Sequence, residues 1–143
     1  MNAALARFMG VDYGEKRVGL AITDPLGIIA SPAGFIARRA GKRPPVAEII
    51  RRAEALEARG FVIGLPLDGN GNETEWTAEV RRVGSEIAKR TGLEVRYLDE
   101  RYSTAASLRA IREMEGSIRG RKGDVDSMAA SLLLQQALNA SNE

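Results

Sequence analysis

Apolar and polar residues alternate along the first third of the chain in the pattern that is typical of β-strands. The run 5–11 is largely apolar, and in the segment 18–23 every second residue is a large apolar one. Alternation over roughly four to eight residues indicates a half-buried strand. The connection 13–16 is short and contains glycine, so we expect these two strands to form a hairpin. A third strand is predicted over 28–36, where Pro32 favours an edge of the sheet.

The spacing changes after residue 44 to that of helices alternating with short strands. Apolar residues three and four positions apart predict amphipathic helices, and short apolar runs predict buried strands between them. The expected helical stripes are 46–53, 76–87, 108–114 and 125–137, and the expected strands are 61–65 and 93–98. Pro44 and Pro45 suit the start of the first helix, and Gly60 and Gly92 are expected to end the first two. The resulting order, βββαβαβαα, predicts an α/β fold with a mixed five-stranded sheet and helices on both faces.

The length and the N-terminal residues add expectations about the domain and the compartment. A chain of 143 residues suits one domain, so we expect 1–143 to fold as a single unit. No run approaches the ~18 apolar residues that a membrane span needs. The segment 1–7 lacks a basic stretch followed by an apolar one, which is the pattern of a signal peptide. We therefore expect a cytoplasmic protein that does not bind membranes.

The absence of cysteine and histidine limits the chemistry that the chain can perform. No cysteine means no disulfide, no thiolate nucleophile and no thiol zinc site. No histidine means no imidazole base and no histidine-bound metal. Any catalysis must therefore come from carboxylates, hydroxyls, lysine, arginine, tyrosine, backbone amides or a hard metal ion.

The basic residues are nearly all arginine, although the net charge is only +2. Arginine binds phosphate in a bidentate manner, which favours a nucleic-acid ligand, whereas a genome that prefers arginine codons explains the same count without any function. Two basic loops, 38–43 and 119–122, gather several of these cations. We interpret the first loop as an extension of a nucleic-acid track.

Acidic residues stand at the ends of three predicted elements. Asp12 ends an apolar strand, Asp99 and Glu100 end another, and Asp124 and Asp126 open an apolar helix. Ligands of α/β sheets collect beyond the carboxyl ends of the strands, and oxygen ligands without histidine or cysteine select Mg²⁺ or Mn²⁺. The spacing alone leaves other interpretations open, because such acids also serve as turn residues, helix caps or solvated surface charges.

Four blocks of the sequence resemble the YqgF (RuvX-like) family of the ribonuclease H-like superfamily. They are Gly10–Ala21, Gly64–Leu67, Leu98–Thr104 and Lys122–Ala130, in the order and spacing of that family. The resemblance covers about residues 6 to 139 and implies a ribonuclease H-like fold and a metal-dependent nuclease. Members of the family are described as resolvases of Holliday junctions, by likeness to RuvC, and as nucleases that process the 5′ end of pre-16S ribosomal RNA.

The resemblance also implies which acids carry the chemistry. Asp12, Glu100 and Asp126 match the catalytic and metal-binding positions, so that Asp99 points away and Asp124 caps the helix. We expect two Mg²⁺ or Mn²⁺ ions, with Asp12 bridging them; paired ions about 3.5–4 Å apart support in-line attack on a phosphodiester. The sequence departs from the family after Leu67, where an additional acid raises the question of substrate contacts at that loop. That acid is Asp68.

Several basic residues are predicted to contact the phosphates of the substrate. They are Lys16, Arg17, Arg101, Arg121 and Lys122. Each of them also has an ordinary interpretation as a solvated charge. The expected partner is pre-rRNA or junction DNA, together with the ribosome in the first case. The expected assembly is a monomer for an rRNA nuclease and a homodimer for a resolvase, which needs two active sites.

Two aromatic residues are candidates for contacts with nucleobases, and two other functional classes share features of this sequence. Trp76 and Tyr102 are able to stack on bases, but Trp76 lies on the apolar stripe of a helix and is expected in the core. A nucleotide-binding enzyme also opens with an Asp-x-Gly hairpin, but it needs a second domain of similar size. A non-catalytic binder on the same fold is the other alternative, and the presence of all three acids argues against it.

Overall fold

Strands form one mixed sheet in the computed structural model, which describes residues 7–39, 42–101 and 122–141. The strands are β1 Phe8–Tyr13, β2 Arg17–Thr23, β3 Ala30–Ala37, β4 Gly60–Leu65 and β5 Glu94–Asp99. Their order in the five-stranded sheet is β3-β2-β1-β4-β5. The first three strands pair antiparallel, and β4 pairs parallel with β1 and with β5. The predicted mixed sheet is confirmed, with the strand that contains Pro32 at its edge.

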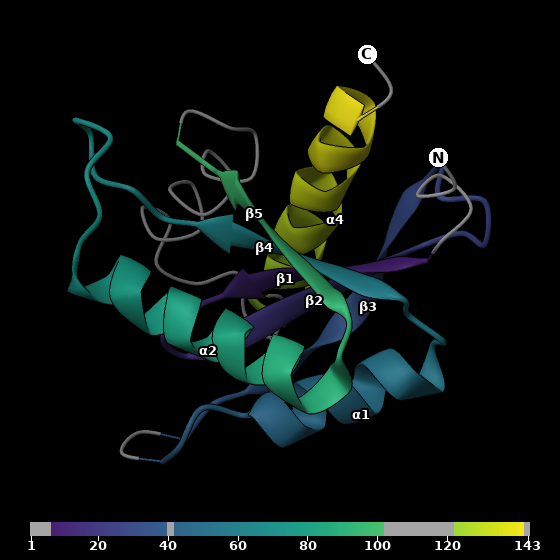
Figure 1. Ribbon diagram of the computed structural model, residues 1–143, viewed down its shortest axis with the longest axis horizontal. Coiled ribbons are helices and arrows are strands. Elements are labelled where there is room, and N and C mark those ends of the chain that lie inside the picture. Colours follow the sequence, from purple (N-terminus) through teal and green to yellow (C-terminus); the bar gives the residue numbers. More distant parts are fainter. Residues whose placement is uncertain (1–6, 40–41, 102–121, 142–143) are drawn as a thin grey trace.

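Helices cover both faces of this sheet, as the sequence predicts. Helices α1 Val46–Ala55 and α2 Glu75–Thr91 lie on one face, and α4 Lys122–Ser141 crosses the other (Figure 1). The helix expected after Ser103 lies outside the described residues. None of the helices in the described part of the chain is long and apolar enough to span a bilayer.

Backbone conformations at the helix ends explain where α1 and α2 stop. Pro45 immediately precedes α1, as expected, and Gly92 ends α2 in the left-handed conformation at φ 71°. The end of α1 differs from the prediction. Glu57 takes the left-handed conformation there at φ 59°, whereas Gly60 begins β4. A Cβ on Gly60 would lie 2.6 Å from the ring of Phe8, so close packing requires glycine at this position.

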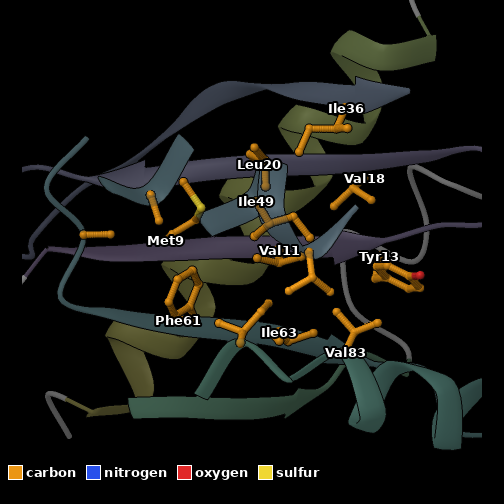
Figure 2. Packing of buried hydrophobic residues seen from close by; sticks show 14 of the residues in the cluster. Met9, Val11, Tyr13, Val18, Leu20, Ile36, Ile49, Phe61, Ile63 and Val83 are labelled. Atoms are coloured by element: carbon orange, nitrogen blue, oxygen red, sulfur yellow. The ribbon is translucent and has the colours of Figure 1, made fainter. Parts of the chain in front are cut away.

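Two apolar cores fill the space between the sheet and its helices. The larger one joins the sheet to α1 and α2 and includes the fully buried Ile49 and Phe61 (Figure 2). The smaller one joins the sheet to α4 and includes Phe8 and Leu133. Side chains alternate along a strand, so β1 turns Val11 and its odd-numbered neighbours toward the first core. The even-numbered residues of β1 therefore face α4.

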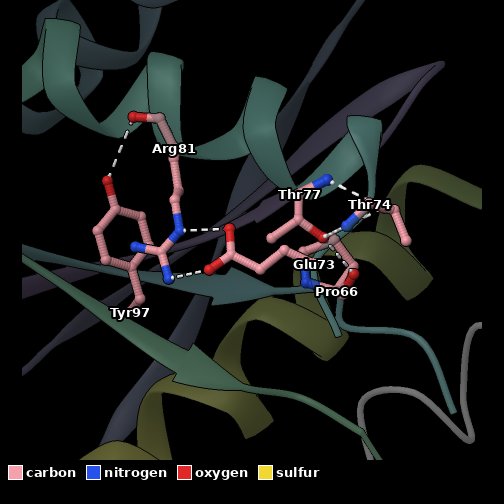
Figure 3. A network of polar contacts seen from close by, with 6 residues as sticks. All are labelled: Pro66, Glu73, Thr74, Thr77, Arg81 and Tyr97. Carbon is pink, nitrogen blue, oxygen red and sulfur yellow. Dashed lines mark hydrogen bonds and ion pairs between the residues drawn. The ribbon is translucent and has the colours of Figure 1, made fainter. Parts of the chain in front are cut away.

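Hydrogen bonds attach the loop after β4 to the start of α2. Thr74 and Thr77 form a reciprocal capping box at the first turn of α2. The Thr77 hydroxyl donates to the carbonyl oxygen of Pro66 at 2.9 Å, and Arg81 donates two bonds of 2.8 Å to Glu73 (Figure 3). The loop that follows β4 is thereby fixed beside the sheet end where the candidate site lies.

Candidate active site

Asp12, Glu100 and Asp126 are the only buried acids among the residues that the structure describes. Their exposed fractions are 3%, 4% and 4%. Asp12 lies in β1, Glu100 directly follows β5, and Asp126 lies in the first part of α4. Burying a carboxylate is costly unless a cation or hydrogen bonds compensate it. Burial therefore distinguishes these three acids from every other described Asp and Glu.

Glycines flank Asp12 on both neighbouring strands. Asp12 pairs with Gly19 of β2, and Val11 pairs with Ile63 of β4, which makes Gly64 the next neighbour of Asp12 on that side. Residues directly across from one another in a sheet turn their side chains to the same face. The Asp12 side chain therefore points to the face on which both glycines leave space.

The other two acids occupy the space above these glycines. A Cβ on Gly19 would lie 2.1 Å from the backbone oxygen of Asp126, and a Cβ on Gly64 would lie 2.6 Å from Oε2 of Glu100. Glycine inside a strand often marks such a close approach. Asp12, Glu100 and Asp126 thus share the α4 face of the sheet, at the end where the parallel strands β1, β4 and β5 have their carboxyl ends.

Arg17 contacts one of these acids rather than solvent. Its Nε lies 2.7 Å from Oδ2 of Asp126, and the two side chains are 20% and 5% exposed. The same turn of α4 is attached to β2 and β3, since the Ser127 hydroxyl donates to the Leu20 carbonyl at 2.8 Å and accepts from the Gly34 N–H at 3.0 Å. These bonds fix the helix start, and with it Asp126, against the sheet.

Asp99 and Asp124, the acids nearest in sequence to Glu100 and Asp126, are exposed and lie outside this group. Asp99 accepts hydrogen bonds from the Arg101 guanidinium, which holds the pKa of Asp99 below its usual range. Asp124 lies within the first turn of α4 and not before the helix, so it is not the predicted cap. Its negative charge interacts favourably with the helix dipole there. Asp68 accepts the N–H groups of Asn70 and Asn72 at 2.9 Å, so it shapes its own loop.

The basic residues predicted to contact phosphates occupy different surroundings. Lys16 is exposed in the turn between β1 and β2. Arg101 is paired with Asp99 at 2.9 Å. Arg121 and the side chain of Lys122 lie outside the described residues. The phosphate contacts of these residues stay predictions.

Arg38, the first cation of the basic loop 38–43, is packed rather than exposed. Its guanidinium lies 4.6 Å above the centre of the Tyr13 ring and 3.5 Å from Glu79. Burial raises the pKa of Tyr13 to about 12, and its hydroxyl donates to Glu79 at 3.2 Å. Trp76 stacks on Tyr13 with ring centres 5.5 Å apart, which confirms that Trp76 belongs to the core. The sequence gives no signal of these contacts of Arg38, because its partners Tyr13, Glu79 and Trp76 lie far from it in the chain.

The donor chemistry of the three buried acids fits a hard divalent cation. All donors are carboxylate oxygens, the kind that Mg²⁺ and Mn²⁺ prefer, and each of the three is buried. Across the described ranges, no three acid side chains converge closely enough to form a ready metal site, and Arg17 holds the Asp126 carboxylate. Binding a cation with all three acids therefore requires the Asp126 side chain to be shared with, or released from, Arg17.

Comparison with known proteins gives a consistent family and fold. The family described as "RuvX: Holliday junction resolvase" matches residues 6–140. A protein of Koribacter versatilis named "Putative pre-16S rRNA nuclease" is 36% identical over 137 residues, covering 96% of this chain and 89% of that protein. A protein of Zymomonas mobilis with the same name is 39% identical over 135 residues, covering 94% of this chain and 81% of that protein. The structure of Thermus thermophilus RuvC superposes with a TM-score of 0.60 at 12% identity, covering 95% and 96% of the two chains. This likeness confirms the ribonuclease H-like fold.

Proposed function

The chain belongs to the RuvX family, and we propose that it is a divalent-metal-dependent nuclease that hydrolyses phosphodiester bonds. The observation that carries this proposal is the group of three buried acids beside Gly19 and Gly64. Buried carboxylates of like charge are unfavourable together unless a cation offsets them, and the chain has no histidine or cysteine to bind a softer metal.

Asp12, Glu100 and Asp126 are the catalytic and metal-binding residues in this proposal, with two Mg²⁺ or Mn²⁺ ions as the cofactor. When bound, such ions lower the pKa of a water molecule and offset charge on the phosphate. Lys16, in the turn after β1, and Arg17, at the start of β2, are cations of the kind that bind the phosphates of a substrate.

Within this proposal the substrate is pre-16S rRNA, cut in its 5′ region during ribosome assembly. Curated relatives that match nearly the whole chain and are named "Putative pre-16S rRNA nuclease" support pre-16S rRNA as the substrate. The family description supports a second candidate, the four-way DNA junction. Both are phosphodiesters and require the same chemistry at the acids. The two candidates differ in assembly, since a resolvase needs two active sites and hence a dimer.

Replacing Glu100 and its exposed neighbour Asp99 tests the proposed function directly. We expect E100Q to lower the rate of cleavage in Mg²⁺ by about a hundredfold or more, because the variant loses a buried anionic oxygen ligand. D99N, the matched control, should stay within about threefold of wild type, since Asp99 lies at the surface and pairs with Arg101. Cleavage is measured on a pre-16S fragment and on a four-way junction, with EDTA as the metal-free condition. Equal rates for E100Q and D99N would contradict the proposal, and the preferred substrate decides between the two candidates.

Arg17 is expected to compete with the metal for Asp126. Two unit charges about 4 Å apart interact by about 4 kcal/mol at an effective dielectric constant of 20, so removing this cation should favour another at the same carboxylate. We expect R17A to bind Mn²⁺ at least about tenfold more tightly than wild type and to melt at a lower temperature in EDTA. Calorimetric titration and thermal melts with and without Mn²⁺ measure both effects. R101A is the control, because its partner Asp99 is exposed; an R17A protein that binds Mn²⁺ no better than R101A would refute the competition.

A further inference from the structure

A groove of about 460 Å³ lies between the start of α1 and one side of α2. Its volume lies within the range of small-molecule sites. The buried residues Val46 and Val83 contribute an apolar surface to it, and three exposed arginines line it as well. These are Arg43, Arg82 and Arg90. The groove lies on the α1–α2 face of the sheet, whereas the three buried acids lie on the α4 face.

Two of the three arginines of this groove form no ion pair in the described part of the chain. The acids that line the groove, Glu79 and Glu86, are paired with Arg38 at 3.5 Å and with Arg90 at 2.7 Å. Within the described ranges, the remaining two arginines of the groove form no ion pair. The groove therefore carries an excess of positive charge next to an apolar surface.

Arg81 and Arg82 are neighbours in α2 but differ in their ion pairs. Arg81 is held by Glu73 through two hydrogen bonds of 2.8 Å (Figure 3), whereas Arg82 lines the groove without such a partner in the described part of the chain. A planar guanidinium without a carboxylate partner matches the geometry of a phosphate group. A phosphate is therefore the ligand chemistry that the two arginines favour.

Arg38 lies at the sheet end where the acids lie, and Arg43, five positions later in the chain, lines the groove. Arg38 donates its backbone N–H to the Lys16 carbonyl at 2.8 Å and its guanidinium to the Gly14 carbonyl at 2.9 Å. These bonds attach the loop to the turn that follows β1, the strand of Asp12. Further exposed cations stand in the turn after β1 and, along the chain, beside Arg38 and at the groove. They are Lys16, Arg39, Lys42 and Arg43.

We propose that the groove between α1 and α2 binds a nucleotide phosphate through Arg43 and Arg82, with its apolar surface against the base or the ribose. The phosphate belongs either to a free nucleotide or to a nucleic-acid strand, and the choice of nucleic acid rests on the proposed function. A strand that reaches the acids continues over the basic turn and loop into the groove. The groove then adds affinity for long substrates without taking part in the reaction.

Binding to AMP and to a single-stranded 12-nucleotide RNA tests this inference. Both titrations are carried out in EDTA, so that they report binding even if the protein cuts nothing, and a failure of the groove is distinct from a failure of the nuclease. We expect R43A/R82A to weaken binding of at least one of the two ligands by about tenfold or more. For the RNA, the magnitude of the slope of log K against log salt should fall by roughly 1.4, about 0.7 for each lost phosphate contact on a single strand.

The matched control removes two cations outside the groove, Arg59 and Lys89, which are exposed on the surface. R59A/K89A should keep wild-type affinity and its salt slope. Loss of AMP and RNA binding in R43A/R82A alone supports a nucleotide site, and loss of RNA binding alone supports a strand contact. The inference is overturned if neither ligand binds the wild type, if R43A/R82A binds both unchanged, or if the two double variants lose affinity equally.

Discussion

The D12N variant is expected to lose metal-dependent cleavage by at least about a thousandfold while it keeps its fold. Asparagine has the shape of aspartate but lacks the negative charge that a divalent cation needs. A loss of about 4 kcal/mol of transition-state stabilisation corresponds to this factor. Asp12 is buried, and replacing its carboxylate by a neutral amide adds no buried charge that would need compensation. Initial rates in Mg²⁺ and a circular-dichroism melt measure both properties.

D124N is the control for this experiment, because Asp124 is an exposed acid in the first turn of α4. It should cleave within about threefold of wild type, as is usual for a surface charge. A D12N protein that melts like wild type and cuts like D124N would remove Asp12 from the site.

The G19A variant is expected to be destabilised by about 3 kcal/mol, which lowers the melting temperature by roughly 10 °C. The added methyl group would lie 2.1 Å from the backbone oxygen and 2.4 Å from the carbonyl carbon of Asp126, and backbone atoms of a packed helix cannot easily move away. Replacing glycine by alanine also restricts the unfolded chain, but this gain is only about 0.4–1 kcal/mol. The clash therefore outweighs this gain, and G19A should be less stable than wild type. Because the clash displaces Asp126, we also expect G19A to cleave more slowly.

G69A is the matched control, since nothing lies within 4 Å of a Cβ at Gly69 and this residue is not among those with positive φ. Its free energy of unfolding should stay within about 0.5 kcal/mol of wild type. Chemical denaturation of both variants measures the difference. If G19A and G69A are equally stable, α4 does not pack on β2 as described.

The order of strands and helices could be predicted from the sequence because each element carries its own periodicity. The alternation in β2 and the helical stripe of α2 are local signals, and the observed sheet follows from them. The predicted end of α1 is wrong because the stop signal there is not a glycine. Glu57 adopts the left-handed turn instead, and Gly60 is required by its contact with Phe8, a residue far away in the sequence.

The sequence predicts which acids form the candidate site, and this stays a prediction, whereas the contacts of these acids cannot be identified from the sequence. Burial of Asp12, Glu100 and Asp126 agrees with the choice of these acids over their neighbours. The pairing of Arg17 with Asp126 joins positions 109 residues apart in the chain, so no local pattern contains it. Gly19 and Gly64 did carry a signal, since glycine inside a strand indicates a close approach, but only the structure identifies what approaches.

The central claim is that these three buried acids bind a divalent cation, and a calorimetric titration of Mn²⁺ into wild type and D12N tests it most directly. Mn²⁺ is a hard ion that oxygen ligands accept, and its binding is measured without any assumption about the substrate. We expect Mn²⁺ to bind saturably to wild type and to D124N, and we expect D12N to bind Mn²⁺ at least about tenfold more weakly. Equal Mn²⁺ affinity of wild type and D12N, or no binding to wild type, would contradict the account.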